Sequence, residues 1–232
     1  MVKHSATTRF DARLSSDGLY GRWAPLYDLI FDLPFHPGRS AAARAASDAA
    51  GANGEILVVG VGTGLELGLL PRSVRVVGID LSSQMLTIAR ERVARKGLRQ
   101  IKALQVMDAA ALEFPAARFD VALAPYVMSV VPSPAKALDE MWRVLKPGGQ
   151  IVIVNHFSAE RGLRARTEAA MEKSAAWLGW HPVFPFAAVG DWLAGRADVE
   201  LVEKRPIAPF RLFTLIRLRK SERPPRSERD QS

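Results

Sequence analysis

The chain has 232 residues, which is enough for one sizeable α/β domain with a continuous core and too few for two full catalytic domains. Hydrophobic residues make up 48% and charged residues 24%, an ordinary balance for a soluble globular protein, and no run approaches the ~18 apolar residues of a membrane span. Because the chain contains no cysteine, disulfides, thiolate metal sites and cysteine nucleophiles are excluded. We expect no metal site.

The net charge of +8 is concentrated at the two ends of the chain. Residues 45–203 carry 17 basic and 17 acidic side chains, whereas residues 1–44 carry 6 against 4 and residues 204–232 carry 9 against 3. Basic ends can attract nucleic acid or an anionic membrane surface, or be solvated tails, and charge alone does not choose between these roles. The first ten residues lack the apolar core of a signal peptide, so we expect a cytoplasmic protein.

The first 44 residues are predicted to form a helical segment outside the main domain. Apolar residues recur there at helical spacing, at Phe10, Leu14, Leu19, Trp23, Tyr27 and Ile30. Gly18 and Pro25 interrupt this pattern, which predicts two or three short helical pieces in place of one uninterrupted helix. Such pieces would cover an edge of the sheet or lie on a membrane surface.

Residues 45–220 alternate between short apolar runs and helical patterns. The predicted strands are residues 56–59, 74–79, 101–106, 119–124 and 150–154, and the predicted helices are residues 65–70, 83–96 and 135–145. Two β-rich segments, 199–205 and 210–219, predict an antiparallel pair that closes the sheet. This order predicts a doubly wound α/β fold with a mostly parallel seven-stranded sheet. Residues 221–232 hold no apolar residue and are predicted to be a disordered basic tail.

A glycine-rich turn follows the first predicted strand, at the edge where open parallel sheets bind their ligands. It contains Gly60, Gly62 and Gly64, whose missing side chains let a ligand press against the backbone. Asp80 ends the next strand, 20 residues after Gly60, and a carboxylate there can accept both hydroxyl hydrogens of an adenosine ribose. The dinucleotide fingerprint G-x-G-x-x-G fails because its last position is Leu65. The pattern therefore indicates a bound nucleoside without a pyrophosphate.

Five segments in this order resemble the motifs of the class I S-adenosylmethionine-dependent methyltransferases, over roughly residues 20–220. They are the glycine turn and the segments 80–85, 107–109, 119–124 and 145–149. The resemblance implies a Rossmann-like fold that binds S-adenosylmethionine and releases S-adenosylhomocysteine. It implies that Asp80 binds the ribose, that Met85 lies beside the adenine and that Asp108 accepts a hydrogen bond from the adenine amino group. The cofactor contacts that it implies are Gly60, Val61, Gly62, Thr63, Gly64, Asp80, Leu81, Met85, Asp108, Ala109 and Ala124.

Within that family the chain resembles the bacterial phosphatidylethanolamine N-methyltransferases, which are related to the quinone-ring methyltransferases. The resemblance rests on two shorter segments, residues 20–31 and 155–157. It implies a phospholipid substrate, with methyl groups transferred to the amine of phosphatidylethanolamine and, in successive steps, up to phosphatidylcholine. We accordingly expect a monomer that associates reversibly with the anionic inner face of the cell membrane and binds no nucleic acid.

Methyl transfer from a sulfonium is an in-line displacement, so such an enzyme mainly positions donor and acceptor and excludes water. An amine acceptor must lose a proton before it can attack, and His156, after the fifth strand, is a candidate for proton transfer or phosphate binding. Tyr20, Tyr27 and Tyr126 are candidates for cation–π contact with the sulfonium or ammonium, with core packing as the alternative. Arg161, Arg164 and Arg166 would bind the headgroup phosphate or lie on a solvated helix face. The aromatic stretch 177–186 would cover the substrate, enter lipid or pack in the core.

Three other functions compete with this interpretation. A quinone-precursor C-methyltransferase would also need access to a membrane but would deprotonate a ring carbon. A soluble small-molecule methyltransferase would need no membrane. A basic nucleic-acid-binding module without catalysis would need a basic face across the folded domain, and the neutral charge of residues 45–203 argues against it.

Overall fold

A computed structural model describes the backbone of residues 19–156, 187–208 and 211–222, and the side chains of residues 35–156, 189–208 and 211–222. The chain forms two compact units, Met1–Phe35 and His36–Ser232. The sheet and all the side chains discussed below belong to the second unit. Residues 157–186, which include the predicted aromatic stretch, and most of the predicted tail, 223–232, lie outside the described residues.

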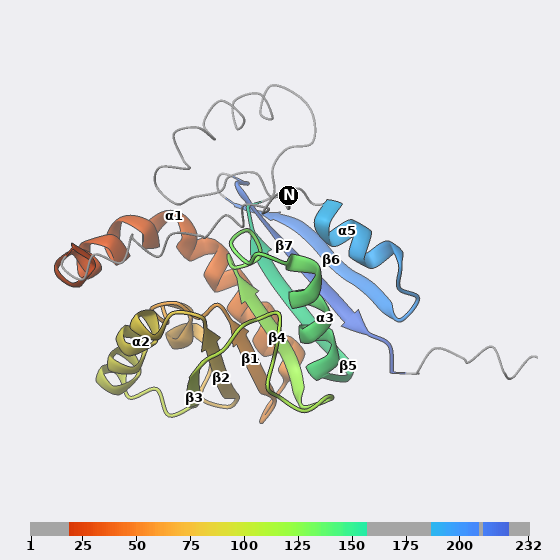
Figure 1. The fold of residues 1–232 in the computed structure, drawn as a ribbon, viewed down its shortest axis with the longest axis horizontal. Helices are drawn as coiled ribbons and strands as arrows, with labels where there is room; N and C mark the ends of the chain where they lie inside the picture. The colour runs from red at the N-terminus through yellow and green to blue at the C-terminus, as the bar shows by residue number, and fades with distance from the viewer. Residues whose placement is uncertain (1–18, 157–186, 209–210, 223–232) are drawn as a thin grey trace, which may run out of the picture. The chain divides into compact units, whose positions relative to one another are not determined.

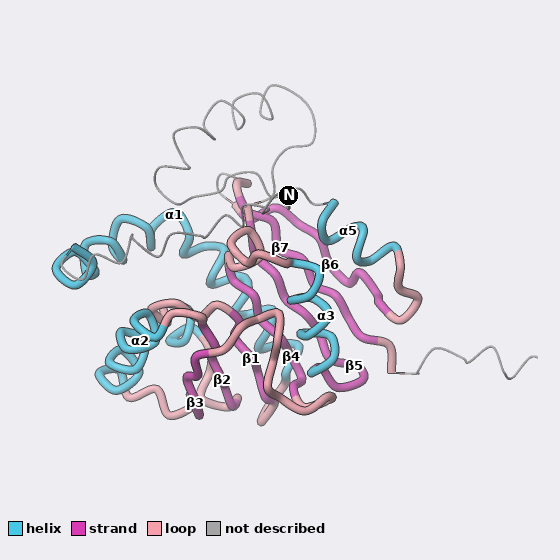
Figure 2. Tube along the Cα trace, viewed as in Figure 1, coloured by secondary structure: helices cyan, strands magenta, loops and turns pink. Residues whose placement is uncertain are grey.

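The second unit is built on a seven-stranded sheet in the order β3-β2-β1-β4-β5-β7-β6 (Figures 1 and 2). Five strands run parallel and β7 runs antiparallel to both of its neighbours. This confirms the predicted mostly parallel sheet with an antiparallel pair at its end. The strands are β1 (Glu55–Val59), β2 (Arg75–Asp80), β3 (Ile101–Val106), β4 (Phe119–Pro125), β5 (Leu145–Asn155), β6 (Val199–Ile207) and β7 (Phe213–Lys220).

Helices cover both faces of this sheet, as a doubly wound fold requires. Leu57 and Val59 of β1 belong to the core cluster that includes α3 and α5, whereas Ile56 and Val58, equally buried, face the other side. Helix α2 packs on β2 and β3. The described helices are α1 (Leu19–Ala50), the 3₁₀ turn η2 (Glu66–Leu69), α2 (Ser83–Lys96), α3 (Pro134–Val144) and α5 (Ala187–Ala194).

The bounds of α2 follow from its capping residues. Ser82 is the N-cap, and its side chain accepts a hydrogen bond from the backbone N–H of Met85 at 3.3 Å. Gly97 ends the helix in the left-handed conformation, at φ +57°, and its N–H donates to the carbonyl of Ala94. The predicted helix 83–96 is confirmed.

Two predicted elements differ from the observed ones. Helix α1 is one continuous helix from Leu19 to Ala50, so the predicted interruption at Pro25 is wrong, while residues 1–18 lie outside the described residues. A proline such as Pro25 removes only one N–H donor, and a helix can continue past it. Strand β5 begins at Leu145, not at residue 150. Leu145 pairs with Phe119 and Gln150 with Val121, so the segment 145–149, which resembles a family motif, forms a bulge inside the strand.

Polar side chains join the amino-terminal ends of β1 and β4. Asp120 accepts hydrogen bonds from the backbone N–H of Glu55 and from the Lys146 ammonium, both at 2.8 Å. The Arg118 guanidinium bonds the Glu55 carboxylate at 2.8 Å and lies 4.7 Å from the centre of the Phe119 ring. We call these five residues the amino-terminal clasp. It lies at the edge of the sheet opposite to the glycine turn.

Candidate cofactor and acceptor site

The candidate site lies at the carboxyl ends of the strands, where the strand order reverses between β1 and β4. After β1 the chain goes on to β2 and β3 on one side, and β4 then lies on the other side of β1. The glycine turn follows β1 and Tyr126 follows β4, so the topology brings both to the crevice. This is the position that the sequence predicted for the ligand.

The three glycines of the turn have different roles. All have positive φ, at +69° for Gly60, +49° for Gly62 and +75° for Gly64. A Cβ at Gly60 would come within 2.4 Å of Val127, and one at Gly64 within 2.8 Å of Leu67, so those two glycines serve the packing of the fold. A Cβ at Gly62 would meet nothing within 4 Å. The backbone of Gly62 therefore borders open space that a ligand can occupy.

Asp80 ties the turn to the end of β2. Its Oδ2 accepts a hydrogen bond from the N–H of Gly62 at 2.8 Å, and its Oδ1 accepts one from the N–H of Ser82 at 2.9 Å. Each carboxylate oxygen can accept a further hydrogen bond, so Asp80 can still receive ligand hydroxyl groups. The turn's second residue, Val61, is buried and donates its N–H to the carbonyl of Ile79 at 2.9 Å. Thr63 is half-buried in the same turn.

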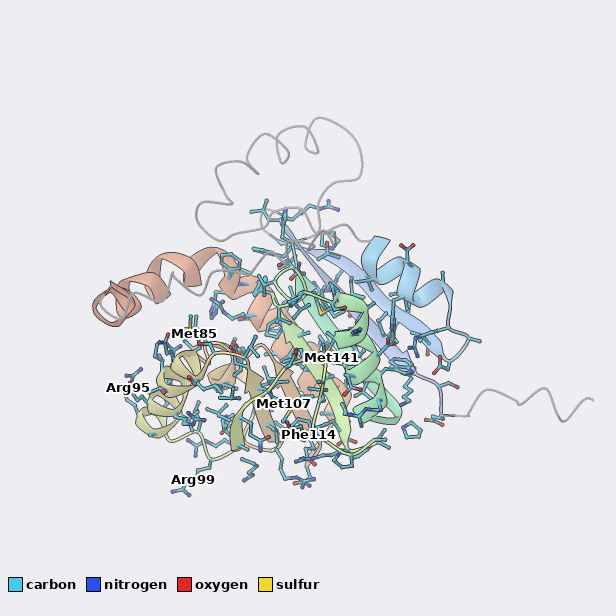
Figure 3. All side chains as sticks on the ribbon, in the orientation of Figure 1. Met85, Arg95, Arg99, Met107, Phe114 and Met141 are labelled. Atoms are coloured by element: carbon cyan, nitrogen blue, oxygen red, sulfur yellow. The ribbon has the colours of Figure 1, made fainter. Side chains whose placement is uncertain are left out.

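The residues expected around the adenine lie at the ends of β2 and β3. Leu81 directly follows Asp80 and is 70% exposed, which is unusual for a leucine beside a buried strand. Met85 is half-buried on α2 (Figure 3). Asp108 is exposed, and its Oδ1 accepts a hydrogen bond from the N–H of Ala110 at 2.8 Å, while Ala109 is buried. An apolar platform, acceptor carboxylates and the space beside Gly62 together fit a nucleoside.

Tyr126 follows β4 in the left-handed conformation, at φ +60°. Its hydroxyl oxygen accepts a hydrogen bond from the backbone N–H of Arg39 on α1, and burial raises the pKa of the phenol. Its ring packs edge-on against Phe213 at 4.9 Å between centroids, and the Arg39 guanidinium carbon lies 6.0 Å from the ring centre. Ala124, at the same end of β4, is fully buried. Tyr126 thus joins α1 to β4 and β7.

His156 bridges the end of β5 and the start of β7. Its Nδ1 lies 2.7 Å from the carbonyl oxygen of Leu212, so Nδ1 carries the proton in that hydrogen bond. In the neutral tautomer Nε2 is then a hydrogen-bond acceptor. The imidazole centroid lies 6.4 Å from that of Phe213, which also contacts Tyr126. The structure therefore brings two predicted catalytic residues to one aromatic ring.

Several predicted residues lie outside the described side chains. Tyr20 and Tyr27 belong to α1, but only their backbone is described. The arginines at 161, 164 and 166 and the aromatic stretch 177–186 are not described at all. Among the described residues, no three His, Asp or Glu side chains are placed to hold a metal ion.

The sequence analysis missed a buried acidic residue beneath the glycine turn. Glu66, the first residue of η2, is 5% exposed, and burial raises its pKa to about 7. Arg39 of α1 and Arg92 of α2 are also buried and act on its charge. These three residues come from separate elements, so no local pattern could have grouped them.

Comparison with known proteins agrees with this geometry. A family model described as a methyltransferase domain matches residues 57–153. The chain is 41% identical, over 201 residues, to a phosphatidylethanolamine N-methyltransferase of Cereibacter sphaeroides, covering 87% of this chain and 95% of that protein. It is 36% identical, over 113 residues, to a ubiquinone/menaquinone biosynthesis C-methyltransferase of Geotalea daltonii, covering 47% and 48% of the two chains.

Solved structures share the fold at low sequence identity. A SAM-dependent methyltransferase from Aquifex aeolicus superposes with a TM-score of 0.57 at 18% identity, over 78% of this chain and 98% of that one. The YcgJ protein from Bacillus subtilis superposes with a TM-score of 0.64 at 17% identity, over 81% and 99% of the two chains. At this level of identity the superposition concerns the fold alone.

Proposed function

Because the chain belongs to the class I S-adenosylmethionine-dependent methyltransferases, we propose that it methylates the amine of phosphatidylethanolamine, in successive steps up to phosphatidylcholine. The observation that carries the proposal is the 41% identity that extends over 95% of the Cereibacter protein. The similarity to the quinone-type relative from Geotalea covers only 48% of that protein. The first similarity therefore includes the segments beyond the cofactor-binding core, which set the choice of acceptor in an enzyme of this kind.

The reaction forms a bond between the amine nitrogen and the methyl carbon while the bond from that carbon to sulfur breaks. S-adenosylmethionine, when bound, supplies the electrophilic methyl group. The carboxylate of Asp80, which accepts the N–H of Gly62, would hold the ribose hydroxyls, and the open space beside the Gly62 backbone would admit the cofactor. The side chains around the crevice align the acceptor amine and exclude water, which is most of what an in-line displacement needs.

The amine has to lose a proton before it attacks, because the ammonium has no lone pair. With Nδ1 of His156 donating to Leu212, Nε2 of the neutral imidazole can accept that proton or a hydrogen bond from the lipid headgroup. Tyr126 keeps its proton, since burial raises its pKa. Its hydroxyl oxygen accepts the N–H of Arg39, so its role is to fix α1 against the end of β4. The contact of Tyr20 and Tyr27 with the ammonium stays a prediction from the sequence.

We propose that the same edge of the sheet contacts the membrane. Among the described side chains five large apolar residues are exposed: Leu81, Val106, Val130, Leu201 and Leu212. All except Leu201 lie at the carboxyl ends of the parallel strands or at the adjoining start of β7. Within the described part of the chain no helix has the length and apolarity of a membrane span. Peripheral binding to the inner face of the cell membrane is consistent with these positions and with the basic ends of the chain.

A second candidate function is C-methylation of a quinone precursor, which the Geotalea relative favours. It would use the same cofactor site and the same membrane contact at the carboxyl ends of the strands. The acceptor would differ, because a ring carbon has to be deprotonated and no amine is present. Neither the Asp80 carboxylate nor the glycine turn distinguishes these two acceptors.

The test is incubation of the purified protein with S-adenosylmethionine labelled on its methyl group and vesicles that contain phosphatidylethanolamine. Labelled mono-, di- or trimethylated lipid supports the proposal and counts the transfers. A parallel incubation offers a demethylated quinone in the same vesicles. Label in the quinone alone overturns the lipid proposal and keeps the methyltransferase assignment.

Vesicle binding is tested separately with two matched leucines of the β6–β7 pair. Leu212 and Leu201 are similarly exposed, at 43% and 47%, but lie at opposite ends of the sheet. We expect Leu212→Gln to weaken sedimentation with anionic vesicles several-fold and Leu201→Gln to leave it unchanged. Equal effects of the two substitutions would contradict the placement of the membrane contact.

A further inference from the structure

Glu66 has a position that the proposed chemistry does not explain. It follows Gly64 by two residues, so its backbone continues directly from the turn that borders the cofactor space. Its side chain is 5% exposed, and its Oε1 is buried without a hydrogen-bond partner. A buried carboxyl oxygen of this kind is costly, which calls for a role beyond packing.

Charged residues from three other elements act on Glu66. Arg39 approaches from α1 and Arg92 from α2, and both lower its pKa, while Asp80 at the end of β2 raises it. Burial is the largest influence and brings the pKa to about 7, so both forms of the carboxyl group are populated near neutral pH. With Glu66 ionised the four formal charges sum to zero, and with Glu66 protonated they leave one positive charge.

We propose that Glu66 is a specificity-determining residue whose buried carboxylate favours the positively charged S-adenosylmethionine over its neutral product. The two cofactors share their adenosine and amino-acid groups and differ by the methyl group and the sulfonium charge. A negative charge beneath the turn therefore attracts the substrate cofactor and is nearly indifferent to the product. The inference holds for any methyl acceptor, because it concerns only the cofactor.

The coupling between ligand charge and protonation is reciprocal. If the ionised form of Glu66 binds S-adenosylmethionine better, then binding of S-adenosylmethionine drives the Glu66 proton into the solvent. S-adenosylhomocysteine would release almost none. In a medium of intermediate dielectric constant, one buried unit charge changes the affinity for a charged ligand by roughly tenfold. This is enough to help an enzyme release its product in the presence of substrate.

The first experiment measures the affinity of both cofactors by calorimetry between pH 5.5 and 8.5, in the native protein and in Glu66→Gln. We expect the native affinity for S-adenosylmethionine to rise roughly tenfold with pH, through about pH 7, and the affinity for the product to change little. In Glu66→Gln the affinities for the two cofactors should depend on pH in nearly the same way. The affinity for S-adenosylmethionine should stay at the low value that the native protein has at acid pH. The cofactor's own amino group titrates equally in both proteins, so the comparison cancels it.

The matched control is Glu91→Gln, which removes an exposed carboxylate from α2 next to Arg92. It should behave like the native protein. Parallel pH profiles for the two cofactors in the native protein would overturn the proposal, as would an unchanged substrate preference in Glu66→Gln. An effect of Glu91→Gln equal to that of Glu66→Gln would also overturn it, since the cause would then be net charge.

A second measurement needs no variant and stands if Glu66→Gln fails to fold. Calorimetry at pH 7 in two buffers of different ionisation enthalpy counts the protons released on binding. We expect about 0.4 proton for S-adenosylmethionine, from a tenfold shift of an acid that is half ionised at pH 7, and close to none for the product. Equal proton release by the two cofactors would refute the role of Glu66.

Discussion

Helix α1 approaches the end of β4 so closely that only glycine fits at position 38. A Cβ built on Gly38 would lie 2.0 Å from the Tyr126 hydroxyl oxygen and 3.1 Å from Cγ2 of Val154. The tyrosine cannot easily give way, because Phe213 packs on its ring and the N–H of Arg39 holds its hydroxyl. Gly38→Ala therefore forces the helix or the ring to move by about an ångström.

Two opposing terms set the size of the effect. Overpacking of a filled site costs about 1–3 kcal/mol, and alanine in place of glycine stabilises a helix interior by about 1 kcal/mol. Because the clash is severe, we expect a cost near the upper end of that range, so that Gly38→Ala lowers the free energy of unfolding by about 2 kcal/mol. In a Tyr126→Phe background the clashing oxygen is absent, so the same substitution should be near neutral.

The assay is urea unfolding of the four proteins of this double-mutant cycle, which isolates the contact between position 38 and the hydroxyl. Gly195→Ala is the control, because a Cβ there would meet nothing within 4 Å and should change stability by less than about 0.5 kcal/mol. If Gly38→Ala changes stability equally with tyrosine and with phenylalanine at position 126, then the contact with the Tyr126 hydroxyl is not the reason that position 38 requires glycine.

Three further predictions concern the cofactor turn. Gly62→Ala should weaken cofactor binding at least tenfold in calorimetry but cost only about 1 kcal/mol of stability, whereas Gly60→Ala should cost more because its Cβ would meet Val127 at 2.4 Å. Asp80→Ala should weaken cofactor binding by about 2 kcal/mol or more, and an unchanged affinity would refute the ribose assignment. Because burial raises the pKa of Glu66 from 4.5 to about 7, the folded state holds that proton more tightly than the unfolded state. Relative to Glu66→Gln, the stability of the native protein should fall by about 3 kcal/mol between pH 4.5 and 7, as followed by unfolding at each pH.

Local sequence patterns predicted most of the sheet and the outline of the site. The strands of the parallel sheet are short apolar runs between turn residues, and the caps Ser82 and Gly97 fix α2 within one turn. The carboxyl ends of parallel strands share one edge, so Gly62 and Asp80 could be placed together before any coordinates. Their hydrogen bond follows directly from that topology.

The remaining features depend on contacts between distant segments. Arg39, Glu66 and Arg92 meet beneath the turn only because three elements pack there, and each looks like an ordinary surface charge in its own helix. The direction of the Tyr126 side chain depends on a left-handed backbone that tyrosine rarely adopts. Helix α1 is a different case, because a local signal, Pro25, predicted an interruption and the helix continues through it.

The amino-terminal clasp makes one end of the sheet more rigid than the other. Asp120 holds Glu55 and Lys146 at the far edge, whereas the glycine turn and Tyr126 lie at the edge where ligands enter. Amide protons at the start of β1 and β4 should therefore exchange with solvent only when the whole domain unfolds, and those of the turn should exchange through local opening. Local opening at the ligand end would then admit and release the cofactor without global unfolding, so the apolar core would stay covered and protected from aggregation.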